Sequence, residues 1–87
     1  MPYHITQFQP TPNPNALKCS LEPRLPDPPR SFRTAADAEG DPLGTALFAV
    51  DGVTSLLLNG DWMTVNKAPD ADWGTVKRGV QSVMAKA

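Results

Sequence analysis

The sequence predicts a single α+β domain, in which an antiparallel sheet of about four strands has two helices packed on one face. Two periodicities among the hydrophobic residues carry this prediction. Four short segments have apolar side chains at every second position, as strands do, and two others have them every three or four positions, as helices do. Their order is ββαββα, and 87 residues have room for one core. Residues 1–87 are therefore expected to form one domain.

The first two strands are expected to form an antiparallel pair because a tight turn joins them. β-Branched and aromatic residues are concentrated in residues 3–8. Strict alternation there gives two faces, Tyr3, Ile5 and Gln7 on one and His4, Thr6 and Phe8 on the other. In residues 17–22 the inward-facing set is expected to be Leu17, Cys19 and Leu21.

The turn between these strands is the run Thr11-Pro12-Asn13-Pro14-Asn15. Each proline fixes its own φ and pushes the residue before it toward extended geometry, while Asn15 tolerates the tight corner that follows. The run is therefore expected to be a stiff surface loop. Taken alone, such a turn is most simply a hairpin connection, and a binding surface is the alternative interpretation.

A proline-rich loop and the first helix follow. Residues 23–29 contain four prolines, which excludes a helix and predicts a surface loop, and residues 31–34 favour a short edge strand. Asp41 as N-cap and Pro42 in the first turn predict a helix start. Gly52 stands where a left-handed cap is usual at a helix end. The apolar stripe of this helix is Leu43, Ala46, Leu47 and Val50.

A second hairpin is expected from residues 53–58 and 61–67, joined at Asn59-Gly60. An Asn-Gly pair favours a type I′ turn, which requires positive φ at both central residues. Alternation in the second strand gives two sides, with Met63 and Val65 toward the helices and Trp62 partly exposed on the other face.

The last helix is expected to begin after Pro69, with Asp70 or Asp72 as its cap. Lys77, Arg78 and Lys86 lie toward its C-terminal part, which suits the helix dipole. Its apolar stripe is Trp73, Val76, Val80, Val83 and Met84. For Trp73 this stripe favours core packing.

Composition excludes several classes of function. The net charge is −1, the sequence pI is near 5.6, and no stripe of basic residues interleaves with aromatics, so nucleic acid is not an expected partner. The longest apolar run is the length of a strand, so no membrane association is expected. The N-terminal residues lack the pattern of a secretory signal, and one cysteine fits a reducing compartment. The expected location is the cytoplasm.

Candidate chemistry centres on Cys19, the only cysteine. Its inward register predicts a small buried apolar side chain, whereas a metal or cluster ligand at a dimer interface is the alternative. His4 with Cys19 supplies two of the four ligands that a structural zinc site needs, so a surface histidine is the simpler interpretation. No phosphate-binding loop and no nucleophile with a nearby base are apparent, so no enzyme is expected. The acidic residues are most simply solvated side chains, several of them at helix starts. They are Glu39, Asp41, Asp70 and Asp72.

With these elements in place, the chain resembles the N-terminal domain of the Nfu/NifU-type iron–sulfur cluster scaffold proteins, over residues 11–84. The resemblance lies in the order and spacing of several short motifs. These are Thr11 to Lys18, Asp41-Pro42-Leu43, Ala46-Leu47-Phe48, Asp51-Gly52-Val53, Asp61-Trp62-Met63-Thr64-Val65 with Lys67, and Asp70 with Asp72-Trp73. Within them, Cys19 stands where the family usually has an aromatic residue, Trp62 stands where it often has Phe, and residues 23–29 depart from the pattern.

In that family a separate C-terminal domain with a Cys-x-x-Cys pair carries the cluster, and residues 1–87 contain no such pair. The resemblance therefore implies a non-enzymatic accessory or protein-docking domain associated with iron–sulfur cluster assembly. It would hold no cofactor and would bind an assembly or recipient protein. The residues expected to contact that partner are Thr11, Asn13, Asn15 and Trp62.

Two other hypotheses stay open. One is a metal or iron–sulfur carrier that forms a dimer bridged by Cys19. The other is a small enzyme, which would require polar groups that converge on a pocket. The sequence leaves the oligomeric state undetermined.

Overall fold

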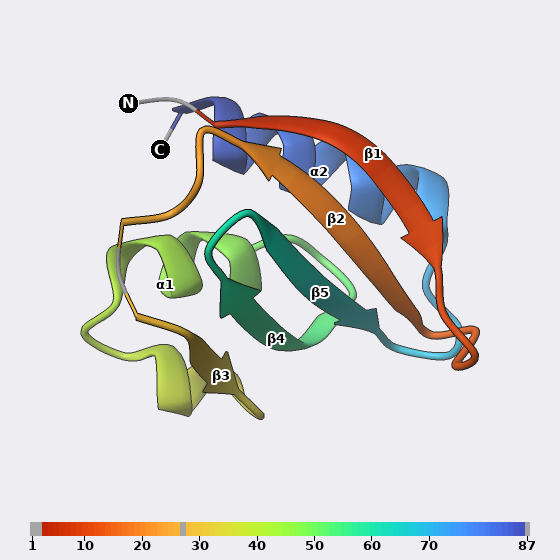
Figure 1. The fold of residues 1–87 in the computed structure, drawn as a ribbon. Coiled ribbons are helices and arrows are strands. Elements are labelled where there is room, and N and C mark those ends of the chain that lie inside the picture. Colours follow the sequence, from red (N-terminus) through yellow and green to blue (C-terminus); the bar gives the residue numbers. More distant parts are fainter. Residues whose placement is uncertain (1–2, 27, 87) are drawn as a thin grey trace.

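The computed structural model describes residues 3–26 and 28–86 of the chain, which form two layers (Figure 1). One layer is a five-stranded antiparallel sheet, and the other consists of helices on one of its faces, so the predicted α+β class is confirmed. The strand order is β1-β2-β5-β4-β3. The elements in chain order are β1 (His4–Pro10), β2 (Ala16–Glu22), β3 (Arg30–Phe32), the short 3-10 helix η1 (Ala35–Ala38), α1 (Pro42–Phe48), β4 (Val53–Asn59), β5 (Trp62–Lys67) and α2 (Trp73–Lys86).

The fifth strand is β3, at the edge where the sequence indicates a short strand. It pairs with β4, and β5 lies at the centre of the sheet between β2 and β4. η1 was not predicted. Thr34 caps it by accepting a hydrogen bond from the backbone N–H of Asp37 at 3.4 Å.

A β-bulge changes the facing of β1. The register pairs Ile5 with Leu21 and then Gln7 with Ser20, so one extra residue lies between them. The strict alternation predicted for residues 3–8 is therefore wrong beyond Ile5. Ile5 and Phe8 are three positions apart, so strict alternation would place them on opposite faces. The extra residue at the bulge lets both face the helix layer.

The turn between β4 and β5 also differs from the prediction. Asn59 pairs with Trp62, so the two central residues are Gly60 and Asp61. Gly60 has φ of 62°, and every non-glycine residue that the structure describes has negative φ. Glycine at the first central position is typical of a type II′ turn, so the predicted type I′ turn at Asn59-Gly60 is wrong.

Both long helices begin as predicted. Asp41 Oδ1 accepts a hydrogen bond from the Gly44 N–H at 3.0 Å, with Pro42 in the first turn of α1. At the start of α2, Asp72 Oδ2 accepts from the Thr75 N–H at 3.0 Å, which decides between the two predicted caps. The end of α1 differs from the prediction, because the helix stops at Phe48 with Ala49 as its C-cap, so Val50 lies beyond it. Gly52 has the expected positive φ, 97°, but in the turn that leads into β4 and not at the helix end.

The core lies between the sheet and the two helices. The side chains with the least exposure come from β2, β4, β5, α1 and α2, and they include Cys19, Leu47, Leu58, Met63, Val65, Val76, Val80 and Met84. Leu25 is also buried, at 4% exposure, and its N–H donates to the Gly60 carbonyl at 2.8 Å. The proline-rich segment is therefore anchored in the core by Leu25, not wholly on the surface, and Asp27 in it lies outside the described residues.

Candidate functional site

The loop between β1 and β2 is built by hydrogen bonds among its own residues. The Thr11 hydroxyl donates toward the carbonyls of Asn13 at 2.9 Å and Ala16 at 3.0 Å, and accepts from the Asn13 N–H at 3.2 Å. Asn13 Oδ1 accepts from the Asn15 N–H at 2.9 Å, as in an Asx-turn. These contacts make the loop a preformed shape, as its prolines predict.

Two residues that lie far from this loop in the sequence, Lys67 and Trp73, form hydrogen bonds with it. Lys67 is 8% exposed, and its ammonium donates to Asn15 Oδ1 at 3.0 Å and to the Ala68 carbonyl at 3.3 Å. The indole N–H of Trp73 donates to the Pro14 carbonyl at 3.0 Å, and the Lys67 ammonium lies 5.6 Å from the Trp73 ring centre. Trp73 is half-buried against the core, and it connects α2 to the loop.

These bonds limit what the loop offers a partner. Thr11 and Asn15 use side-chain oxygens inside the molecule and are only partly exposed, while Pro12, Asn13 and Pro14 are exposed. The Thr/Pro/Asn pattern is thus explained in large part by the construction of the turn. Of the predicted contact residues in the loop, Asn13 is the one that stands outward.

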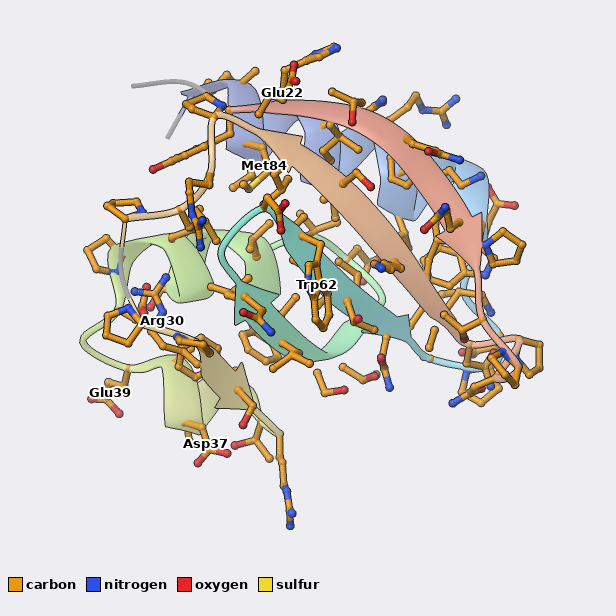
Figure 2. The ribbon with its side chains drawn as sticks, viewed as in Figure 1. Glu22, Arg30, Asp37, Glu39, Trp62 and Met84 are labelled. Carbon is orange, nitrogen blue, oxygen red and sulfur yellow. The ribbon has the colours of Figure 1, made fainter. Side chains whose placement is uncertain are left out.

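The other predicted contact residue, Trp62, lies on the face of the sheet that no helix of the described residues covers (Figure 2). It alternates with buried Met63 and is partly exposed, as predicted. The Lys18 ammonium lies 5.1 Å from its ring centre, a cation–π contact. Leu57 of β4 is also partly exposed on this face. We call this surface, centred on Trp62 and including Lys18, Ser20, Leu57 and Thr64, the open face.

Trp62 and the loop do not form one continuous contact. Trp62 pairs with Ser20, whereas Ala16, which follows the loop, pairs with Asn66 at the other end of β5. Four residues of strand span roughly 13 Å, so a partner must extend along the sheet to touch both. The tryptophan that lies against the loop is Trp73, a contact between residues far apart in sequence that local patterns do not reveal.

Cys19 is buried in the core at 1% exposure, so its predicted inward register is confirmed. Burial raises the pKa of its thiol from 9.0 to about 12, and the positive charge of Lys77 opposes this only in part. At neutral pH the group is a protonated thiol, whereas the form that ligates metals is the thiolate. In the described part of the chain, no three His, Cys, Asp or Glu residues lie close enough to hold a metal ion together.

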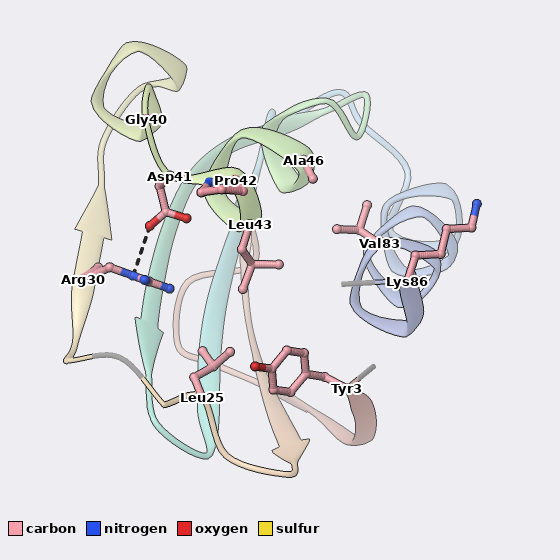
Figure 3. Close-up of a pocket in the computed structure, with 10 residues that line it drawn as sticks. All are labelled: Tyr3, Leu25, Arg30, Gly40, Asp41, Pro42, Leu43, Ala46, Val83 and Lys86. Carbon is pink, nitrogen blue, oxygen red and sulfur yellow. Dashed lines mark ion pairs between the residues drawn. The ribbon is translucent and has the colours of Figure 1, made fainter. Parts of the chain in front are cut away.

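A pocket of about 600 Å³ opens on the helix side of the sheet (Figure 3). Its walls come from the N-terminal end of the chain, the proline-rich segment, β3, α1 and α2. The Arg30 Nε lies 3.2 Å from Asp41 Oδ2, an ion pair at one end of the pocket, and Tyr3 points into it from the opposite side. Local sequence patterns do not reveal this pocket, because its walls are distant from one another along the chain.

No helix among the described residues is long and apolar enough to cross a membrane. The fold and these surfaces define a small α+β domain with a preformed loop, an uncovered sheet face and a buried thiol. The chain belongs to the family described as Scaffold protein Nfu/NifU N terminal, which matches residues 5–87.

Curated relatives carry the same family's names. The chain is 39% identical over 77 residues to human NFU1 iron-sulfur cluster scaffold homolog, mitochondrial, covering 86% of this chain and 30% of that protein. It is 34% identical over 79 residues to NifU-like protein 5, mitochondrial, of Arabidopsis thaliana, covering 90% of this chain and 29% of that protein. The chain therefore spans about 30% of the length of these relatives.

Solved structures share the fold. The crystal structure of protein SAV1430 from Staphylococcus aureus aligns with a TM-score of 0.75 and 27% identity, covering 92% of this chain and 96% of that one. The solution structure of a NifU-like protein from Saccharomyces cerevisiae aligns with a TM-score of 0.78 at 24% identity, covering 98% and 77% respectively. The first of these is a chain of similar extent to residues 1–87.

Proposed function

We propose that this chain is a non-enzymatic protein-docking domain associated with iron–sulfur cluster assembly. The observation that carries the proposal is a family match over residues 5–87 combined with a single cysteine that is 1% exposed. Relatives of this family are named as iron–sulfur cluster scaffolds, which supports a role in the same process. A domain whose one thiol is protonated and enclosed contributes to that process by binding a protein.

The open face is the proposed docking surface. A partly exposed tryptophan on the central strand of a sheet presents a large rigid area, and tryptophan is enriched among residues that dominate binding energy at interfaces. The backbone beneath Trp62 is held on both sides, because β5 pairs with β2 and β4. Little conformational entropy is lost when a partner covers such a surface. Asn13 at the end of the sheet extends the proposed contact.

The expected partner is an iron–sulfur assembly or recipient protein, and we propose the cytoplasm as the location. A single, buried cysteine fits a reducing compartment.

A pull-down from extract of the source cells tests this surface. We expect Trp62→Ala to reduce the recovered partner at least tenfold and Asn13→Ala to reduce it less. Arg78→Ala, on the exposed side of α2, is the control and should leave recovery unchanged. If both surface variants recover as much partner as the unmodified chain, the proposed surface is wrong.

A carrier that holds a cluster through a Cys19-bridged dimer is the second candidate, and the burial of Cys19 counts against it. Anaerobic reconstitution with iron and sulfide separates the two. We expect a colourless protein after desalting. A stable brown dimer that is lost in Cys19→Ala would support the carrier instead.

A further inference from the structure

Three side chains of the open face, Trp62, Leu57 and Lys18, are neighbours through the register of the sheet. Thr64 of β5 pairs with Lys18 of β2 on one side and with Leu57 of β4 on the other. Trp62 is two positions from Thr64, so it lies diagonally across from both, within reach of aromatic and long side chains. Lys18 and Leu57 are two strand spacings apart, roughly 10 Å. The three side chains form one patch, which we call the Trp62 patch, and a single short segment of chain is long enough to cover it.

Trp62 and Leu57 form the apolar part of the Trp62 patch. Both are partly exposed, whereas the residues that follow them in the same strands, Met63 and Leu58, are buried on the helix side. No helix among the described residues covers the open face, so both side chains contact water (Figure 2). An apolar side chain laid on them would remove this surface from water, which favours association.

Lys18 supplies the charge of the Trp62 patch. Its ammonium lies 5.1 Å from the Trp62 ring centre, so the indole holds it in place. Within the described part of the chain, Lys18 forms no ion pair with a carboxylate. This distinguishes it from Arg30, which is paired with Asp41. The ring leaves the charge of the ammonium uncompensated, so Lys18 has N–H donors to offer to an acidic group of a partner.

The charges of the open face are arranged asymmetrically about Trp62. The exposed acidic residues Glu22 and Asp61 lie on the side of the β4–β5 turn, where Arg24 lies against Gly60. Figure 2 shows Glu22 well away from Trp62, at the end of β2. On the side of the loop, Lys18 carries the one charge among the described residues that face this way from the three central strands. These residues are Ala16, Lys18, Ser55, Leu57, Thr64 and Asn66. An acidic group is therefore favoured beside Trp62 on the loop side.

We propose that the open face binds a short acidic segment of a partner protein, with an apolar side chain on Trp62 and Leu57 and an Asp or Glu carboxylate at Lys18. The proposal rests on the docking function of the open face and adds the chemistry of the segment that docks there. A partner that covers the patch shields this charge pair from water, which strengthens it. An extended chain advances roughly 3.3 Å per residue, so the acidic and apolar residues of the segment lie within about three positions of each other.

Selection of random linear peptides displayed on phage, with the folded chain as bait, tests this chemistry. We expect the enriched peptides to have Asp or Glu within about three positions of an aromatic or aliphatic residue. The same selection on Lys18→Glu should enrich Lys or Arg at that place instead, because the charge of the patch is reversed. Enriched peptides without an acidic residue, the same acidic peptides from both baits, or no enrichment at all would overturn the proposal.

Affinities of the most enriched peptide for four variants locate the contact. Trp62→Ala should bind it at least about tenfold more weakly. Lys18→Gln should also bind it about tenfold more weakly and with a smaller dependence on salt, whereas Lys18→Arg keeps the charge and should retain most of the affinity. Arg24→Gln removes a cation beside the turn, outside the patch, and should change the affinity less than about twofold. Equal losses in Lys18→Gln and Arg24→Gln would indicate a general attraction for anions and contradict the proposal.

Recovery of the natural partner in the pull-down separates the acidic segment from the docking function itself. We expect both Trp62→Ala and Lys18→Glu to reduce recovery. If Trp62→Ala reduces it and Lys18→Glu does not, the open face docks a partner but the proposed acidic segment is wrong. If neither variant reduces it, the open face is not the docking surface, and both proposals fail.

Discussion

At the level of single residues, the environment of Lys67 explains how the loop between β1 and β2 is held in place. It is a buried cation, and its hydrogen-bond acceptors in the described part of the chain are neutral oxygens: Asn15 Oδ1, the Ala68 carbonyl and, at 3.5 Å, the Pro69 carbonyl. Buried acceptors that lose their donor cost free energy, more so when the donor is charged. The ammonium of Lys67 therefore fixes both the loop and the connection to α2.

We expect Lys67→Met to lower the free energy of unfolding by about 1–3 kcal/mol, because methionine keeps the apolar stem but leaves the buried oxygens without a donor. Urea denaturation measures the change. Lys18→Met is a matched control, since Lys18 also lies over a tryptophan but is partly exposed, and its loss should cost less than about 1 kcal/mol. Equal losses of unfolding free energy in the two variants would show that the buried hydrogen bonds of Lys67 contribute no more to stability than the exposed contact of Lys18.

Cys19 gives a prediction about pH. Its pKa is raised from 9.0 to about 12 by burial, so between these values the folded chain retains a proton that the unfolded chain releases. Stability from this group is complete below about pH 9 and is lost as the pH rises toward about 12, by about 1.4 kcal/mol per pH unit. Urea denaturation across this range should show a steeper decline for the unmodified chain than for Cys19→Ala. Parallel declines would contradict the assignment.

The burial of Cys19 also predicts that its thiol reacts slowly in the folded chain. At pH 8 a thiol-specific reagent should modify Cys19 far more slowly in the folded chain than in urea, because attack requires an exposed thiolate. Modification of the folded chain at the unfolded rate would mean that the thiol is accessible, and it would revive the dimer-bridging hypothesis.

At the scale of elements, the contact between α2 and the segment that follows α1 depends on Gly79, which lies against Val50. A Cβ there would lie 2.6 Å from Val50 Cγ1 and 3.2 Å from Cγ2, and a β-branched side chain has little freedom to move away. Alanine is otherwise the better residue inside a helix, by about 1 kcal/mol. The sign of the change in unfolding free energy for Gly79→Ala therefore reports how tightly α2 packs against Val50.

We expect Gly79→Ala to lower the free energy of unfolding by about 1 kcal/mol or more, since overpacking outweighs the gain in helix propensity. The double variant Val50→Ala with Gly79→Ala should recover part of this loss, because the clashing methyl groups are gone. Thermal denaturation of both single variants and of the double variant gives the interaction free energy between positions 50 and 79. Stabilisation by Gly79→Ala alone would mean that α2 packs loosely against Val50.

Local patterns predicted the elements better than the details of their connections. Caps such as Asp41 and the alternation in β5 depend on neighbouring residues, and both were predicted. The bulge in β1 and the type II′ turn depend on how strands pair, which a single segment does not specify. Leu25 has no periodic neighbours, because prolines surround it, so its burial gave no signal.

For the candidate sites too, local patterns predicted some features and missed those that depend on tertiary packing. The outward facing of Trp62 followed from alternation and is confirmed. The contact of Asn15 with Lys67 joins residues 52 positions apart, and the pocket joins five parts of the chain. Such arrangements come from tertiary packing, so the sequence alone did not predict them.

At the scale of the whole molecule, the two faces of the sheet differ in their roles. The helix side contains the core, the buried thiol and the pocket, while the open face has Trp62 at its centre and no covering element among the described residues. A sheet that is covered on one side only and has a preformed loop at one end is suited to binding a second protein there. We propose that the open face is where this domain docks.

Site-specific photo-crosslinking in cells tests that claim most directly. A photoreactive residue at Thr64, on the open face two positions from Trp62, leaves the tryptophan intact, and one at Arg78 on α2 is the control. We expect Thr64 to give a discrete adduct containing an iron–sulfur assembly or recipient protein, and Arg78 to give little or none. Adducts from Arg78 at equal yield, or none from Thr64, would contradict it.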